Sequence, residues 1–276
     1  MAQSSYNIEK VYSVFNMIDR YFYEEKQKGG GSVEYTDASI RKYCPYYSDR
    51  GKHYCMNYLY RASSGVINLL DNLKNYGLES DKLAEYAILF LSYKLNQHSE
   101  HKYKFANLND FYTKHIKTNN DYNKKIKDNG STYKEIIDQK KDLMNIKEIS
   151  KFNGLFSILC KLYNEIKNNK LDCKKYSNYP QNFANKFEEL NNDSNINGNT
   201  SYSKLLSTLS DDYNHLKNIY DSNNSCNFPP LPKVKTPPSK LIPALSVFPV
   251  IPVFLGIAYK TIFKKKIKKN NEENEA

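Results

Sequence analysis

Five cysteines are the residues of this chain whose chemistry depends most on spacing. They are Cys44, Cys55, Cys160, Cys173 and Cys226. None of them forms the C-x2-C spacing of a structural zinc site, so disulfide bonds are the better prediction. Cys44 pairs most simply with Cys55 across a short loop, and Cys160 with Cys173 across the end of a helical stretch. Both bridges require an oxidising compartment.

The pairing of two of these cysteines is left open. Cys160 lies on the apolar face of its helical stretch, where a buried free thiol is the alternative to a bridge. Cys226 has no neighbour that would assign it, and it stays an unassigned thiol.

The sequence contains no set of residues typical of an enzyme. His98 and His101 lie three residues apart, but no third metal ligand follows at a familiar spacing. Gly29–Gly31 lacks the lysine and strand context of a phosphate-binding loop and is interpreted as a flexible connection. The G-x-S-x-G, H-E-x-x-H and protein-kinase motifs do not occur. We therefore predict a protein that is not an enzyme and that uses no metal or cofactor.

Apolar residues at helical spacing indicate the elements that position the cysteines. The spacing i, i+3, i+4, i+7 is clearest from Leu83 to Leu95, after an N-cap at Ser80 or Asp81. The strongest stripe, residues 146–166, is expected at the centre of the domain. Further helices are predicted at residues 8–22, 55–75, 108–117, 131–143, 179–190 and 202–219. Because no sustained alternation of period two is present, the predicted fold class is all-α.

The C-terminal part of the chain changes in composition. Residues 223–240 contain five prolines, which favour an extended stalk. The predicted organisation is a multi-helix ectodomain at residues 1–222, a Pro-rich stalk at 223–240, a transmembrane helix at 241–263 and a short basic then acidic cytoplasmic tail at 264–276.

The predicted membrane anchor is the most apolar segment of the chain. Residues 241–259 carry no charge, and the stretch reaches bilayer length at Phe263 if Lys260 extends its amine to the interface. Three prolines predict a kinked span. The alternative, a buried core helix, would normally show a polar face, which this stretch lacks. The anchor is marked by Leu241, Pro243, Pro249, Pro252, Gly256 and Phe263.

Lysines at the end of the span predict its orientation. The interfacial basic residues are Lys260, Lys264, Lys265, Lys266, Lys268 and Lys269. Only three lysines, Lys233, Lys235 and Lys240, lie in the proline-rich stretch before the span, so the positive-inside bias places the tail in the cytoplasm and residues 1–240 on the other side. Insertion of the span after synthesis is the alternative, and it would leave the large domain in the cytoplasm.

The charge balance excludes one class of partner. The formal net charge is +11, but the lysines are dispersed and only four of the 41 basic residues are arginines. Base readout relies on bidentate guanidinium contacts, so we predict no nucleic-acid partner. A solvated, lysine-rich surface is the expected reading of this charge.

Several segments occur in an order that resembles a known family. They include RKYCPYY, VINLLDNL, KLAEYAILFLSYKLNQ, KDLMNIKEISKFNGLFSILCKLYNEI, FPPLP and SVFPVIPVFLGIAYK. Together they resemble the Plasmodium interspersed repeat (PIR) superfamily of variant antigens, with the rodent-parasite branch most similar. The resemblance spans essentially the whole chain.

This resemblance implies a mostly helical, disulfide-stabilised ectodomain on one C-terminal anchor, encoded by a multigene family. It also implies expression at the surface of the infected red cell or parasite, and no enzymatic role. The chain departs from the family pattern at two places: Val66 stands where relatives usually carry a cysteine, and Cys173 is followed by Tyr176 where they often carry C-x2-C. Both departures affect which cysteines pair.

The resulting functional prediction is a membrane-anchored variant surface antigen of a malaria parasite, acting in immune evasion or in binding a host ligand. Its expected partners are the lipid bilayer and a host protein or glycan. The alternative is a cytoplasm-facing scaffold or trafficking component without a display role. The state of the thiols separates the two, because a Cys44–Cys55 bond fits a secretory ectodomain and free thiols fit the cytosol.

Overall fold

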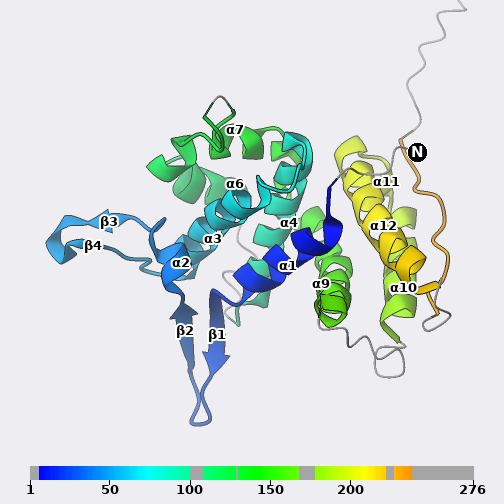
Figure 1. The fold of residues 1–276 in the computed structure, drawn as a ribbon, viewed down its shortest axis with the longest axis horizontal. Coiled ribbons are helices and arrows are strands. Elements are labelled where there is room, and N and C mark those ends of the chain that lie inside the picture. The colour runs from blue at the N-terminus through cyan, green and yellow to red at the C-terminus, as the bar shows by residue number, and fades with distance from the viewer. Residues whose placement is uncertain (1–5, 100–107, 129, 168–177, 222–226, 238–276) are drawn as a thin grey trace, which may run out of the picture. The chain divides into compact units, whose positions relative to one another are not determined.

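Helices form most of the fold, as the apolar spacing predicts (Figure 1). The computed structural model describes residues 6–99, 108–128, 130–167, 178–221 and 227–237. The longer helices are α1 (Ile8–Asp19), α3 (Tyr58–Leu73), α4 (Ser80–Gln97), α9 (Asn153–Lys167), α10 (Asn178–Asn192) and α12 (Thr200–Asp221). The shorter ones are α2 (Ala38–Arg41), α6 (Leu108–Phe111), α7 (Tyr133–Asp138), α8 (Ile146–Ile149) and α11 (Ser194–Asn197). Single turns complete the set: η1 (Ser48–Arg50), η2 (Tyr112–Ile116), η3 (Asn120–Asn123), η4 (Lys141–Met144) and η5 (Ser150–Phe152).

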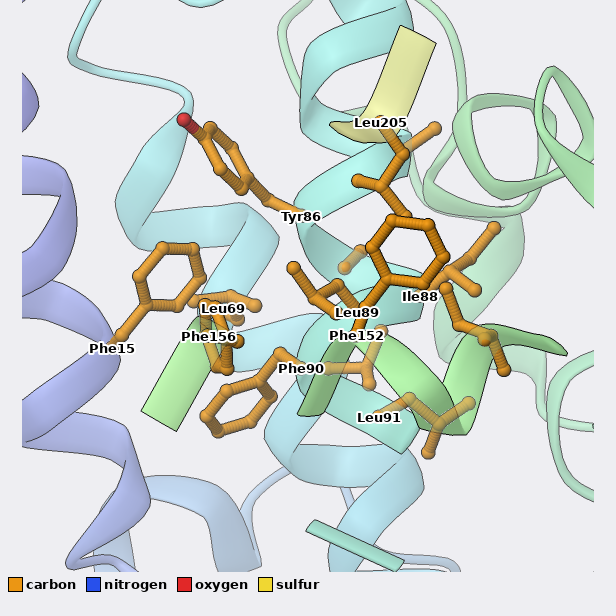
Figure 2. Packing of buried hydrophobic residues seen from close by; sticks show 14 of the residues in the cluster. Phe15, Leu69, Tyr86, Ile88, Leu89, Phe90, Leu91, Phe152, Phe156 and Leu205 are labelled. Atoms are coloured by element: carbon orange, nitrogen blue, oxygen red, sulfur yellow. The ribbon is translucent and has the colours of Figure 1, made fainter. Parts of the chain in front are cut away.

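The strongest apolar stripe of the sequence does lie at the centre of the domain. It divides into α8, η5 and α9, and α9 packs against α1, α4, α10 and α12. Figure 2 shows aromatic side chains from three of these helices meeting in the core, where Phe15, Phe90 and Phe156 are fully buried. The Phe15 and Phe156 rings make an edge-to-face contact with centroids 4.9 Å apart, a geometry that adds to the hydrophobic gain.

Asp212 of α12 is a buried polar centre within this core. The hydroxyl groups of Tyr12 and Tyr86 each donate a hydrogen bond to its carboxylate at 2.8 Å. Tyr163 donates to its backbone carbonyl oxygen, also at 2.8 Å. Burial raises the pKa of Asp212 to about 7. The tyrosines come from α1, α4 and α9, so one residue of α12 joins four helices.

The structure is helix-rich, as the all-α prediction requires, but it also contains strands that were not expected from the sequence. Two antiparallel hairpins are present: β1 (Phe22–Lys26) pairs with β2 (Ser32–Thr36), and β3 (Tyr46–Tyr47) pairs with β4 (Lys52–His53). Consequently the first helix ends at Asp19, and Gly30 and Gly31 form the hairpin turn with φ values of 89° and 82°. Positive φ is the conformation that glycine adopts without steric cost. The glycines expected to make a flexible connection therefore close a defined turn.

Other predicted boundaries also change. The N-cap of α4 is Glu79, so the predicted cap at Ser80 or Asp81 is wrong. The Asn-rich residues 191–199 lie between two predicted helices, where their polar composition favours an exposed loop, but they contain α11 and bury Asn191 and Ile196. The side-chain amides of Asn191 and Asn197 donate hydrogen bonds to the carbonyl oxygens of Lys233 and Asn191, which satisfies polar groups in this packed segment.

Residues 227–237 of the predicted stalk belong to the helical domain instead. These residues, named here the strap, run beside α12 and α10 (Figure 1). Phe228 is only 2% exposed, and Leu231 and Val234 also contact the core. These three residues recur every third position, which is the repeat of a polyproline helix and places them on one side of an extended chain.

Hydrogen bonds to the backbone hold the strap in place. Tyr213 donates to the Pro229 carbonyl oxygen at 3.0 Å, and the Lys217 ammonium donates to that of Phe228 at 2.8 Å. The Asn191 side chain both donates to the Lys233 carbonyl oxygen and accepts from the Lys235 amide. Extended proline-rich backbone has carbonyl groups without internal partners, and the helices supply donors for them.

The helical unit that contains the strap ends at Pro237 rather than at residue 222. The remaining stalk residues, the predicted anchor at 241–263 and the tail at 264–276 lie outside the described residues. Within the part of the chain that the structure describes, no helix is both long enough and apolar enough to cross a membrane.

Candidate ligand-binding surface

The inner face of the β1–β2 hairpin attaches it to the helices. Phe22 at the start of β1 is completely buried. The ammonium group of Lys94, itself buried in α4, donates to the carbonyl oxygens of Phe22 and Asp19 at 2.8 and 2.9 Å. This cation fixes the turn between α1 and β1, so the direction in which the hairpin leaves the domain is set by α4.

Two carboxylates face the same side of this hairpin. Glu24 and Glu34 are directly opposite each other in the register, an arrangement in which like charges repel. Cationic and polar neighbours compensate: Arg61 pairs with Glu34, and His98 Nε2 lies 3.0 Å from a Glu34 oxygen. Burial raises the pKa of Glu24, but hydrogen bonds from Ser32 and Ser99 outweigh it and hold that pKa at about 2. The carboxylates on the inner face therefore already have partners within the domain.

The outer face of the same hairpin carries exposed aromatic and apolar side chains. Tyr23 and Tyr35 are paired across the strands, and their rings stack with centroids 5.0 Å apart. Val33, on the same face, is 56% exposed. Such a cross-strand aromatic pair stabilises the hairpin, yet both rings remain exposed to solvent.

The second hairpin is closed by the Cys44–Cys55 disulfide, which confirms that prediction. The two Cα atoms are 5.1 Å apart, and both cysteines are buried beside the hydroxyl group of Ser64 in α3. Residues 44–55 are named here the disulfide loop. Its base is thus fixed to the core, while the β3–β4 hairpin extends away from α2 and α3 (Figure 1).

The disulfide loop has internal contacts that define its shape. The Tyr54 amide donates to the Pro45 carbonyl oxygen at 3.0 Å, and His53 Nδ1 lies 2.6 Å from the Cys44 carbonyl oxygen. Gly51 ends η1 in the left-handed region with a φ of 59°. A covalent closure, a two-residue ladder and a glycine turn leave the loop few alternative conformations.

Exposed large apolar side chains gather on these two hairpins. Within the described residues, all six of them fall between residues 23 and 56: Tyr23, Val33, Tyr35, Tyr46, Tyr54 and Met56. Tyr46 and Met56 are the most open on the disulfide-loop side, at 61% and 55% exposed. The Tyr46 ring contacts His53 edge to face, and the Arg50 guanidinium lies 4.9 Å from the centroid of Tyr54. Tyrosine, methionine and arginine are the residues enriched in protein interfaces.

The disulfide loop and its N-terminal flank are also basic. Arg41, Lys42, Arg50 and Lys52 are exposed there, with Asp49 as the one exposed carboxylate in residues 41–56. Sequence reasoning missed this surface, although a signal was present: three of the four arginines of the chain lie between residues 41 and 61.

The other predicted site residues do not join this surface. Cys160 is a free thiol, 6% exposed, and burial raises its pKa. This matches the alternative given for it, while Cys173 and Cys226 lie outside the described residues. So do all the anchor residues and interfacial lysines predicted between residues 241 and 269.

The fold and the site define a class of protein: a helical domain that carries a hairpin closed by a disulfide. Comparison with solved structures shows where this class is known. A structure titled "Structure of a Plasmodium PIR protein ectodomain" matches with a TM-score of 0.59 and 32% sequence identity. The match covers 82% of this chain and 100% of that chain. A search of curated proteins found no match.

The family model described as "Plasmodium variant antigen protein Cir/Yir/Bir" matches residues 12–260. The chain therefore belongs to this family of Plasmodium variant antigens, as the ordered segments of its sequence predict.

Proposed function

We propose that this protein is a membrane-anchored variant surface antigen whose helical domain faces outward from the parasite or the infected red cell. The observation that carries the proposal is the buried Cys44–Cys55 disulfide. Structural disulfides form in secretory compartments and are rare in cytosolic proteins. The bond therefore argues against the alternative, a cytoplasm-facing scaffold.

The sequence supports single-pass anchoring of this domain. Residues 241–259 are uncharged, and the six lysines from Lys260 to Lys269 favour a cytoplasmic tail. The lipid bilayer is the proposed partner of this segment, and the domain before it is the part that meets the host.

On this proposal the domain serves immune evasion or binds a host ligand, which is a protein or a glycan. The exposed aromatic residues of the two hairpins support a binding role, because soluble domains seldom expose such groups together without a partner. Nucleic acid is not a proposed partner, since the lysines are dispersed.

Trypsin treatment of intact cells that display the protein tests the topology. Lys26 and Lys28 border the exposed turn between β1 and β2, and we expect cleavage there, because such turns are preferred sites of nicking. The lysines that flank residues 191–199, Lys186 and Lys204, lie within the helices α10 and α12 and should resist cleavage in the folded protein. An antibody against residues 264–276, applied after lysis, should detect loss of the full-length band.

Permeabilised cells provide the control that shows the protein is cleavable. Survival of the full-length chain on verified intact cells, with cleavage after permeabilisation, would reject outward display and support the cytoplasm-facing scaffold.

A further inference from the structure

We propose that the disulfide loop, residues 44–55 with Met56, is a docking surface for a host protein whose contact region carries carboxylates. This inference rests on the proposed outward display and adds to it the position of the contact and the chemistry of the partner.

Apolar exposure is the first argument. Tyr46 is 61% exposed and Met56 is 55% exposed, and in the described residues such side chains are confined to the two hairpins. Keeping large apolar groups in water forfeits the hydrophobic gain of burying them. Three of the six, Tyr46, Tyr54 and Met56, lie within eleven residues of the disulfide loop and its end, and such a cluster marks an interaction site.

Rigidity is the second argument. The base of the disulfide loop is buried at Cys44 and Cys55, and the β3–β4 pairing and the Tyr54 to Pro45 hydrogen bond order the rest. A loop that already has one conformation loses little entropy when it binds. Tyrosine adds contact area at low entropic cost, since it has only two rotatable side-chain bonds.

Charge identifies the partner. Arg50 and Lys52, with Asp49 as the one carboxylate, give the disulfide loop a local charge of +1. The exposed Arg41 and Lys42 beside its base bring the charge of residues 41–56 to +3. The Arg50 guanidinium lies 4.9 Å from the centroid of the Tyr54 ring and its Nε is 3.9 Å from a carboxylate oxygen of Asp49, yet its side chain remains 48% exposed. A guanidinium group recognises a carboxylate with two parallel hydrogen bonds. Acidic side chains on the partner complement this surface.

Apolar area favours a protein over a glycan. Met56 and Tyr46 offer flexible and aromatic surface beside the cations, the combination found in the buried core of protein interfaces with arginine and tyrosine as hot spots. A sialylated or sulfated glycan would supply the anions but little apolar surface to cover Met56.

The test uses the full-length chain in fluorescent nanodiscs of zwitterionic phosphatidylcholine. The probes are rodent red cells, leukocytes and endothelial cells, and binding is measured by flow cytometry. We expect saturable binding to one of these cell types. Tyr46→Ala and Arg50→Ala should each weaken it by about tenfold or more, as for a central interface residue. Prior trypsin treatment of the cells should abolish binding.

A matched variant controls for general charge. Lys161→Ala with Lys186→Ala removes two exposed lysines from α9 and α10, outside the hairpins, and should leave binding unchanged. Circular dichroism should show the same melting curve for all variants, because the replaced side chains are exposed. Raising the salt concentration should weaken wild-type binding more than binding by the Arg50 variant.

Three results overturn the inference. They are the absence of binding to every cell type, unchanged binding by both loop variants, and loss of binding after neuraminidase or heparinase treatment of the cells. The last result identifies a glycan. None of them bears on the trypsin test of display, so a failure of this inference and a failure of the proposed function are distinguishable.

Discussion

At the scale of single residues, Asp212 of α12 is the titratable residue to which side chains from α1, α4 and α9 donate hydrogen bonds. Its carboxyl group has no contact with solvent that could stabilise a negative charge, and two tyrosine hydroxyls provide the hydrogen bonds to it. Burying a charge is costly, and the nearby Lys82 offsets only part of that cost. The raised pKa, about 7, is the consequence.

We predict that this residue makes stability depend on pH. An unfolded aspartate has a pKa of about 3.9. Between about pH 4 and 7 the folded protein keeps a proton that the unfolded chain releases, so the free energy of unfolding falls as pH rises through this window. Asp212→Asn, which keeps the shape, should flatten that fall. Denaturant unfolding of both proteins from pH 4 to 8 measures it, and parallel curves would contradict the prediction.

The cysteines allow a second prediction at this scale. Without reductant, native protein should resist alkylation at Cys160, because a buried thiol with a raised pKa supplies little thiolate. After unfolding, Cys160 should react while peptides containing Cys44 and Cys55 remain linked. Mass spectrometry of the digests decides it. Alkylation of Cys44 or Cys55 without reductant would reject the disulfide.

At the scale of elements, the contact between α3 and β1 depends on one glycine. A Cβ atom on Gly65 would lie 2.5 Å from Cε1 of Phe22, which is buried and cannot move aside. Gly65→Ala should therefore lower the free energy of unfolding by about 2 kcal/mol and loosen the β1–β2 hairpin.

Gly154→Ala in α9 is the matched control. Its nearest neighbour would be the Cδ atom of Lys186 at 3.1 Å, in a flexible side chain that can shift. Alanine also favours a helix by about 1 kcal/mol over glycine, so this variant should be neutral or slightly more stable. Equal destabilisation of both variants in thermal melts would show that the Phe22 contact is not the cause.

The strap gives a further prediction. Phe228→Ala should cost about 3 kcal/mol, the usual loss for a buried phenylalanine. Lys233→Ala should change stability by less than about 0.5 kcal/mol, since its side chain is exposed and only its backbone is bonded. Urea unfolding compares them. Equal stability of Phe228→Ala and wild type would mean that the strap detaches readily in solution.

Most helices could be predicted from the sequence, because a buried stripe such as that of α9 repeats at 3.6 residues regardless of what it packs against. The β1–β2 hairpin could not. Its inner face carries Glu24 and Glu34, whose partners Arg61 and His98 are distant in sequence, so no apolar alternation marks the strands. The strap was misinterpreted for a related reason, since proline content shows an extended chain but not whether a surface binds it.

The candidate surface could also be predicted only in part from the sequence. The Cys44–Cys55 bond followed from short separation and turn residues. The exposure of Tyr46 and Met56 depends on which side of the hairpin meets the helices, and tertiary packing alone decides that.

At the scale of the whole molecule, the proposed anchor sets where the domain acts. Deleting residues 241–263 should move the protein from the membrane pellet to the supernatant in alkaline carbonate extraction, because these residues supply the apolar length that spans a bilayer. The full chain should stay in the pellet. Its appearance in the supernatant would contradict the anchor.

The packing of the strap against the helices bears on how the protein would respond to mechanical tension. Tension between a bound host cell and the bilayer would enter the domain at Pro237, where the helical unit ends. It would act first on the hydrogen bonds of Asn191 and Lys217 and on the packing of Phe228. Detaching residues 227–237 would release up to about 30 Å of extended chain while the disulfide still closes the loop. If the strap detaches before the helices unfold, the protein lengthens under tension while its helical core and its disulfide loop keep their structure.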